Sequence, residues 1–258
     1  MHIRELFDLK GRVAVVTGGY GLYGRPISEA LAEAGAQVII ASRCRKRCED
    51  WAAELTARGL AACAEEMDQS DGPSILAFCK RVYERWNDVD VLVNNSVGRS
   101  MESYADSLEA WRESMEVNAT GLFAISRSFL DRMMNRGRGS IVNISSIQGV
   151  VAPDFHNYDG TGMTTSPDYQ FHKHGMIGLT KYLAAVGGPR GVRVNAISPG
   201  GLRTPDHGEP FISQYCRRVF LGRMAEYDDI KGAAVFLASD ASRYVTGHNL
   251  LVDGGYSC

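Results

Sequence analysis

Seven short, nearly continuous apolar runs alternate with longer helical patterns along most of the chain. The apolar runs are rich in β-branched residues and do not alternate with polar ones, which indicates parallel strands that are covered on both faces. The predicted strands are Val13–Thr17, Gln37–Ala41, Ala61–Met67, Val89–Asn94, Ser140–Ser145, Val192–Ser198 and Asn249–Val252. The helical patterns lie near 22–34, 44–58, 71–86, 107–135, 167–187 and 226–239. This alternation predicts an α/β fold with a doubly wound parallel sheet of about seven strands and helices on both faces.

The length of 258 residues predicts a single domain that spans residues 1–258. Two irregular segments, 149–168 and 200–222, interrupt the regular alternation. Long loops in a compact α/β domain are usually lids or binding loops. We therefore expect both segments to lie near a functional site.

Charge and composition exclude several classes of partner. The formal net charge is −2, so the chain has no bulk attraction to nucleic acid or to an anionic membrane surface. No apolar run is long enough to span a bilayer, and Met1–Lys10 lacks a secretory pattern, so we expect a cytoplasmic protein.

No metal site is predicted. The six cysteines form no CxxC pair, and Cys44 and Cys48, one helical turn apart, have no second pair of ligands nearby. His172 and His174 are two positions apart on a predicted helix and therefore point to different sides.

A glycine-rich turn follows the first predicted strand and precedes a helix: Thr17-Gly18-Gly19-Tyr20-Gly21-Leu22-Tyr23-Gly24. Glycines there let backbone N–H groups approach a pyrophosphate, and the helix N-terminus favours the negative charge. The sequence therefore predicts a Rossmann-type dinucleotide site. A tight turn required only for packing is the alternative.

The end of the second predicted strand bears on the choice of cofactor. Rossmann folds that bind NAD usually place an acid there for the ribose 2′-hydroxyl, whereas this chain has Ser42 and Arg43, followed by three more basic residues at 45–47. Arginine can pair with a 2′-phosphate. We therefore expect NADP(H), with NAD still possible. A solvated basic start of a helix is the alternative.

A candidate acid–base pair lies further along the chain. Tyr169 and Lys173 are four positions apart, on one face of a predicted helix. A tyrosine ordinarily has a pKa of about 10, too high for a base near neutrality, but a cation at ~4 Å favours the phenolate. Ser146 follows a predicted strand directly, and Asn118 falls on the apolar stripe of the helix at 107–135. A structural asparagine that kinks this helix is the alternative for Asn118.

Taken in order, these pieces resemble the short-chain dehydrogenase/reductase family over essentially the whole chain. The matching residues also include Asp68 after the third strand, Asn94 and Asn95 after the fourth, the Pro199-Gly200 turn with Thr204, and the ending 245–255.

The resemblance implies a role for each matching residue. Tyr169 would exchange the proton of the substrate oxygen, Lys173 would favour its phenolate and hold the nicotinamide ribose, and Ser146 would polarise the carbonyl. Asn118 would anchor a water molecule. The implied cofactor contacts are Gly18, Tyr20, Gly21, Leu22, Tyr23, Gly24, Ser42, Arg43, Asp68, Asn94, Asn95, Tyr169, Lys173, Ile197, Pro199, Gly200 and Thr204.

Three departures from the family pattern stand out. Leu22 occupies the usual place of the middle glycine, and Ser96-Val97-Gly98 replaces the usual Ala-Gly. Ser146 and Tyr169 are also further apart than is habitual, which makes 149–168 an insertion in the active-site region. The other irregular segment, 200–222, is expected to be the substrate-binding loop or lid.

The insertion contains polar residues suited to hydroxyl or amine groups, among them Asp154, His156 and Tyr158. With Ser146 and Tyr169 they form the predicted substrate set. The insertion is also similar to short-chain enzymes of bacterial sugar pathways, including those that modify flagellin. The hypothesis is a polyol, sugar or amino-sugar substrate. A surface insertion tolerated at little cost is the alternative.

Two other functions remain open from the sequence. One is a sugar-nucleotide dehydratase or epimerase with retained NAD(P), and the other is a catalytically silent dinucleotide-binding protein. The resemblance also implies a homo-oligomer, a tetramer or dimer, formed through the helices at 107–135 and 167–187 and the last strand.

Overall fold

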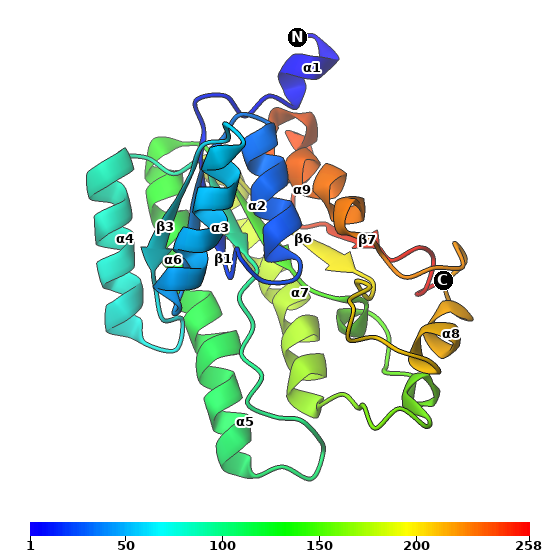
Figure 1. Ribbon diagram of the computed structural model, residues 1–258. Coiled ribbons are helices and arrows are strands. Elements are labelled where there is room, and N and C mark those ends of the chain that lie inside the picture. The colour runs from blue at the N-terminus through cyan, green and yellow to red at the C-terminus, as the bar shows by residue number, and fades with distance from the viewer.

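The computed structural model describes all 258 residues and is built around one sheet of seven parallel strands (Figure 1). The strands are β1 Val13–Thr17, β2 Gln37–Ser42, β3 Ala62–Glu66, β4 Val91–Asn94, β5 Gly139–Ile144, β6 Val192–Pro199 and β7 Asn249–Val252. The predicted doubly wound α/β fold is confirmed, and each predicted strand overlaps an observed one.

The order of the strands is β3-β2-β1-β4-β5-β6-β7, so the winding reverses between β1 and β4. The pairing of Val15 with Leu92 lies at this reversal. The connections that leave the two neighbouring strands run to opposite sides, which opens a crevice at their carboxyl ends.

Helices cover both faces of the sheet. One face carries α2 Gly24–Glu33, α3 Arg45–Ala57 and α9 Lys231–Ala238, and the other carries α4 Gly72–Trp86, α6 Leu122–Arg136 and α7 Pro167–Gly187. Successive strand residues serve the two cores in turn, as when Val15 packs on the α4–α6–α7 side and Val16 on the α2–α3–α9 side. No helix is both long and apolar enough to cross a bilayer.

The predicted helix at 107–135 is wrong as a single α-helix. It consists of α5 Leu108–Met115, a π-helical turn η1 Glu116–Gly121, and then α6. At the turn the backbone passes so close to its neighbour that a Cβ on Gly121 would lie 1.8 Å from the carbonyl oxygen of Gln69. The wider helical turn accommodates this approach.

Part of the apolar stripe expected on that helix was also misassigned. Leu108 is 73% exposed, whereas Ile125 and Phe129 are buried. A π turn contains one more residue than an α-helical turn, so the side chains of α5 are rotated about the helix axis relative to those of α6. The apolar stripe of α6 therefore does not continue into α5.

The two irregular segments pack against each other beside the sheet. Tyr158 of segment 149–168 stacks on Phe211 of the short helix α8 Phe211–Cys216, with ring centroids 5.8 Å apart. The amide of Asn157 donates a 2.7 Å hydrogen bond to the hydroxyl of Tyr256 near the C-terminus. Segments 149–168 and 200–222 therefore form one cap, which includes α8 (Figure 1).

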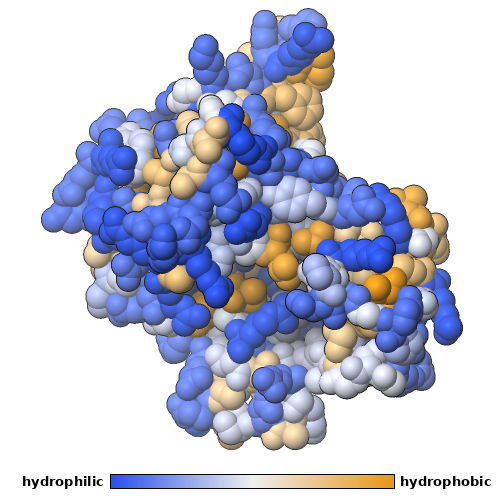
Figure 2. All heavy atoms as spheres, viewed as in Figure 1, coloured by the Kyte–Doolittle hydropathy of each residue, from blue (hydrophilic) through white to orange (hydrophobic).

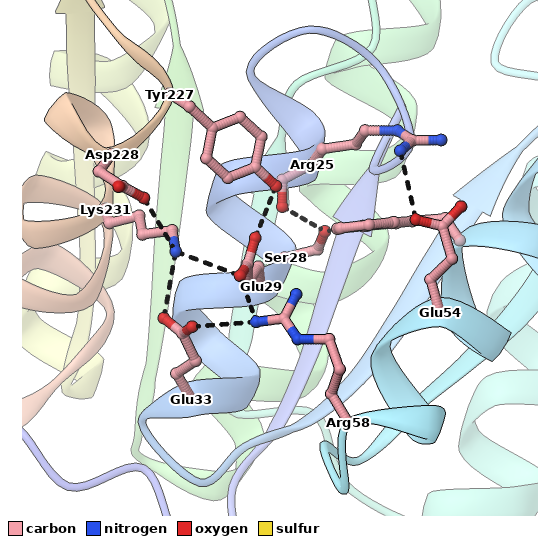
Figure 3. Close-up of polar contacts among 10 residues, drawn as sticks. Arg25, Ser28, Glu29, Glu33, Glu54, Arg58, Tyr227, Asp228 and Lys231 are labelled. Atoms are coloured by element: carbon pink, nitrogen blue, oxygen red, sulfur yellow. Dashed lines mark hydrogen bonds and ion pairs between the residues drawn. The ribbon is translucent and has the colours of Figure 1, made fainter.

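A cluster of charged and polar side chains links α2 to the end of α3 and to the start of α9 (Figure 3). Glu29 accepts hydrogen bonds from Tyr227 and Arg58, and it lies 3.3 Å from the ammonium of Lys231. Although burial alone raises the pKa of Glu29, the hydrogen bonds from Tyr227 and Arg58 and the charge of Lys231 lower it to about 2. Glu29 thereby fixes α2 to its two neighbours. The remaining helix, α1 Ile3–Leu6, lies at the N-terminus.

Candidate active site

A cleft of about 710 Å³ opens at the carboxyl ends of the strands, where the winding reverses. Figure 2 shows this face of the molecule hollowed near its middle, with apolar side chains on the walls of the hollow. Fourteen of the residues predicted from the sequence line the cleft: Gly18, Tyr20, Gly21, Leu22, Tyr23, Ser42, Arg43, Asp68, Asn95, Ser146, Tyr169, Lys173, Pro199 and Gly200.

The glycine turn is held against the loop after β4. Gly18 has a φ of +60°, and a Cβ on Gly24 would lie 2.1 Å from the carbonyl oxygen of Gly18. The amide of Asn95 donates to the carbonyl oxygens of Thr17 and Gly18 at 3.1 and 2.9 Å. Gly24 therefore packs behind the turn, and Asn95 fixes the conformation that the turn presents to the cleft.

Leu22, one of the departures, has room at the mouth of the cleft. Its side chain is 65% exposed and meets no packing constraint that would require glycine. Next to it, the Tyr23 hydroxyl donates a 2.7 Å hydrogen bond to the carbonyl oxygen of Gly200. This bond joins the glycine turn to the start of segment 200–222.

The basic residues after β2 separate into two groups. Arg45 and Lys46 pair along their own helix with Glu49 and Asp50 at 2.8 and 2.6 Å. Arg43 instead lines the cleft, is exposed and takes part in no ion pair. Arg47 is also exposed without an ion pair and lies with its guanidinium carbon 5.7 Å from the centroid of the Tyr20 ring. Of the basic residues after β2, Arg43 is the one that lines the cleft, where it is free to meet an anion.

Several residues that the resemblance associates with the cofactor lie away from the cleft surface. Asn94 is buried and donates to Ser126 and Asn143 at 2.9 and 2.8 Å, which ties β4 to β5 and α6. Ile197 is fully buried in the core. Thr204 lies in segment 200–222 and does not line the cleft.

Lys173 enters the cleft from α7 with its charge withdrawn from solvent. Its Nζ donates a 2.7 Å hydrogen bond to the carbonyl oxygen of Ile144 and lies 5.4 Å from the centroid of the Tyr169 ring. Burial, and after it the positive charge of Arg99, lower the pKa of Lys173 to about 7. The ammonium is held beside the phenol by the end of β5.

Ser146 and Tyr169 both face this cleft, from the end of β5 and from α7. The hydroxyl oxygen of Ser146 accepts a 3.1 Å hydrogen bond from the backbone N–H of Gln148. Its neighbour Ser145 donates a 2.8 Å hydrogen bond to the carbonyl oxygen of Lys173, which fastens α7 to the strand end. The hydroxyl proton of Ser146 remains available to a group in the cleft.

Asn118 lies outside the cleft, in the π turn, and holds the loop after β4. Its Oδ1 accepts from the Gly98 N–H at 2.8 Å, and its Nδ2 donates to the Gly98 carbonyl at 2.9 Å and to Ser114 at 3.0 Å. The second departure, Ser96-Val97-Gly98, is thus bound tightly in place. A glycine suits position 98 because a Cβ there would lie only 3.0 Å from the side chain of Val117.

The sequence reasoning missed two groups near the site. Arg99 lines the cleft, with its guanidinium carbon 4.9 Å from the centroid of the Tyr169 ring. Asp168 and His172 directly precede Tyr169 and Lys173 on α7, are buried, and both bond to Ser114. The signal was present as two i,i+4 polar pairs, Ser114 with Asn118 and Asp168 with His172, each on a buried helix face.

None of the three predicted substrate residues in the insertion reaches the cleft. Asp154 pairs with Arg218 at 3.2 Å, and His156 is 91% exposed beside Asp159. The Tyr158 hydroxyl accepts from Gln148 at 3.3 Å, and its ring belongs to the cap. Polar character alone could not show that Asp154 and Tyr158 join segment 149–168 to segment 200–222, or that His156 lies in solvent.

Comparison with known proteins extends over nearly the whole chain. Residues 23–257 match the family model described as enoyl-(acyl carrier protein) reductase. The chain is 34% identical to a 3-oxoacyl-[acyl-carrier-protein] reductase FabG of Aquifex aeolicus, over 96% of this chain and 98% of that protein. It is 35% identical to a D-threitol dehydrogenase of Mycolicibacterium smegmatis, over 97% of this chain and 95% of that protein. The chain belongs to the short-chain dehydrogenase/reductase family.

A solved structure of another short-chain dehydrogenase/reductase superposes closely. It is a gluconate 5-dehydrogenase from Burkholderia cenocepacia J2315 in complex with NADP and tartrate, 31% identical, with a TM-score of 0.89 and 99% of each chain covered. The present short-chain dehydrogenase/reductase is accordingly an NAD(P)-dependent oxidoreductase that acts on CH–OH groups.

Proposed function

We propose that this protein is an NADP(H)-dependent dehydrogenase that interconverts a secondary alcohol and a ketone in a polyol, sugar or amino-sugar derivative. One observation carries the proposal. The ammonium of Lys173 is buried beside Tyr169 in a cleft that also exposes Ser146 and an unpaired Arg43.

The residues present fit a dinucleotide phosphate. The glycine turn leaves space for a phosphate beside its backbone. A Cβ on Gly18 would occupy part of that space, since the Cβ would lie 3.0 Å from the backbone of Ser96. Arg43 at the end of β2 has no carboxylate partner and would hold a 2′-phosphate. Asp68 lines the same side of the cleft, where the adenosine would lie. A bound nicotinamide supplies the hydride donor or acceptor of the reaction.

The chain's own residues handle the proton. In the direction of oxidation, the phenolate oxygen of Tyr169 accepts the proton of the substrate hydroxyl, and the nearby ammonium of Lys173 favours that phenolate. The hydroxyl of Ser146 donates a hydrogen bond to the same substrate oxygen. In the direction of reduction, Tyr169 returns the proton.

The substrate class rests on relatives as well as on the site. Two of the similar proteins are dehydrogenases named for a polyol and for a sugar acid. They are the D-threitol dehydrogenase and the gluconate 5-dehydrogenase. The test is a turnover screen that sets polyols, sugars and amino sugars against hydrophobic ketones and steroids. Turnover confined to the hydrophobic set would overturn this part of the proposal.

We propose in addition that the protein is a homo-oligomer, associated through α5–α6 and α7. Large apolar side chains on these helices face solvent, among them Leu108, Phe171 and Tyr182 at 73, 56 and 65% exposure. Burial of such a surface favours association. Sedimentation at micromolar concentration tests this, and a monomer would contradict it.

A further inference from the structure

Arg99 is an unpaired cation at the reactive end of the cleft. It is exposed, takes part in no ion pair within the protein, and lies with its guanidinium carbon 4.9 Å from the centroid of the Tyr169 ring. The proton-transfer chemistry proposed above does not need it, since Lys173 already supplies the cation beside the phenol.

The charges along the cleft are unevenly distributed. The charged side chains that line it are Arg43, Asp68, Arg99 and Lys173. Asp68, the only acid, follows β3 and accepts hydrogen bonds from the backbone N–H and hydroxyl of Ser70. Near Tyr169, therefore, Arg99 and Lys173 line the cleft and no carboxylate does, since the buried Asp168 points to Ser114. The potential in this part of the cleft favours an anion.

The loop that carries Arg99 is held in place from behind. Both backbone polar groups of Gly98 are bonded to the Asn118 side chain, and Asn118 donates to Ser114. Ser114 in turn donates to Asp168, the residue directly before Tyr169. The backbone at Arg99 is thus connected to the start of the helix that bears Tyr169, which reduces the loss of freedom when a ligand binds.

We infer that Arg99 binds an anionic group of the substrate, a carboxylate or a phosphate, so that the preferred substrate is a hydroxy acid or a phosphorylated polyol. This inference rests on the proposed function and narrows its substrate class. The planar guanidinium can donate two parallel hydrogen bonds to either anion. Its distance from the Tyr169 ring places that anion close to the reacting carbon.

The test compares three matched ligands of one carbon skeleton: gluconate, glucitol 6-phosphate and the neutral glucitol. Each is given to the NADP⁺-loaded wild type and to Arg99→Met, Arg99→Lys and Arg190→Met, with kcat/KM and the ligand-induced shift in Tm as readouts. Arg190 is an exposed arginine outside the cleft and serves as the matched control.

We expect the wild type and Arg190→Met to prefer at least one of the anionic ligands over glucitol by 10-fold or more. Arg99→Met should reduce that ratio by about 10- to 100-fold, because a hydrogen-bonded charge pair is lost, and Arg99→Lys should retain part of it. Preference for gluconate identifies a carboxylate, and preference for glucitol 6-phosphate identifies a phosphate.

Two results would overturn the inference. One is the absence of any anion preference in the wild type, in turnover and in Tm shift alike. The other is an equal loss for all three ligands in Arg99→Met, which would show that Arg99 acts on Tyr169 rather than on the substrate. A Tm shift by an anion that depends on Arg99, without turnover of any alcohol, would support the inference while contradicting the proposed dehydrogenase activity.

Discussion

The hydroxyl of Ser114 donates a 2.5 Å hydrogen bond to the carboxylate of Asp168 and so joins α5 to the helix of Tyr169 and Lys173. A serine has one hydroxyl proton, so the two other partners of this oxygen must donate to it. They are Nδ2 of Asn118 and Nε2 of His172, each at 3.0 Å. Nε2 of His172 therefore carries a proton, and because the pKa of His172 is lowered to about 4, the imidazole is neutral near pH 7.

Loss of the Ser114 hydroxyl should destabilise the fold. Ser114→Ala removes a donor from the buried Asp168 and an acceptor from Asn118 and His172, and we expect a loss of about 2–4 kcal/mol in the free energy of unfolding. Urea denaturation measures it. Ser128→Ala is the control, because the half-buried Ser128 donates back to the Ala124 carbonyl of its own helix and has no charged partner. Equal losses in the two variants would show that the Ser114 network contributes nothing special.

Protonation of His172 should couple stability to pH. Burial, opposed by the charge of Asp168 and assisted by that of Lys173, lowers the pKa of His172 to about 4. Between pH 6.5 and 4 the unfolded chain therefore binds a proton at this residue that the folded chain does not, and stability falls as the pH falls.

His172→Gln keeps an N–H donor and removes that titration. Over this pH range the wild type should lose up to about 3 kcal/mol more stability than the variant. Unfolding curves recorded at several pH values would test the difference. If the two proteins lost stability in parallel, His172 would not be held neutral by its surroundings.

Arg43 should determine the preference for NADPH. Arg43→Ser removes the basic residue after β2 that lines the cleft without an ion-pair partner, and we expect the Kd for NADPH to rise about 10- to 100-fold while that for NADH changes little. Titration by cofactor fluorescence measures both. Arg45→Ser is the matched control, since Arg45 already pairs with Glu49. An equal effect of the two variants would assign the basic cluster to the solvated start of α3.

The contacts of Glu29 should stabilise the fold at neutral pH and lose their effect in acid. Its lowered pKa means that the stabilisation is present above the unfolded value near 4.5 and is lost as the pH falls toward 2. Glu29→Gln at pH 7 should cost about 2–4 kcal/mol, because Arg58 and Lys231 lose their shared carboxylate. Glu54→Gln, at an exposed pair with Arg25, should cost less than about 1 kcal/mol by the same unfolding assay. Similar costs would contradict the role assigned to Glu29.

The fold could be predicted from the sequence because each strand is a short apolar run and most helices repeat apolar residues with the helical period. The sequence also placed Ser146, Tyr169 and Lys173, since residues at strand ends and on one helix face meet at the carboxyl edge of a parallel sheet. The π turn at 116–121 was not predictable, because it follows from the close approach of Gly121 to Gln69, a contact between distant segments.

The insertion could not be assigned from the sequence for a related reason. Asp154 and Tyr158 are suited to a substrate by chemistry alone, but Arg218 and Phe211, more than fifty positions later, are their partners in the structure. The place of Arg99 could not be predicted either, because its position over the Tyr169 ring depends on the conformation of the loop after β4.

The most direct test of the central claim is net formation of NADPH from NADP⁺ and a polyol or sugar acid, compared between the wild type and Tyr169→Phe. We predict one NADPH released for each alcohol oxidised by the wild type and a loss of at least 1,000-fold in kcat for Tyr169→Phe, with NADPH affinity retained. Conversion of substrate without net NADPH would indicate a dehydratase or epimerase that recycles its cofactor. Unchanged turnover in Tyr169→Phe would contradict the role of Tyr169 and with it the mechanism proposed for this site.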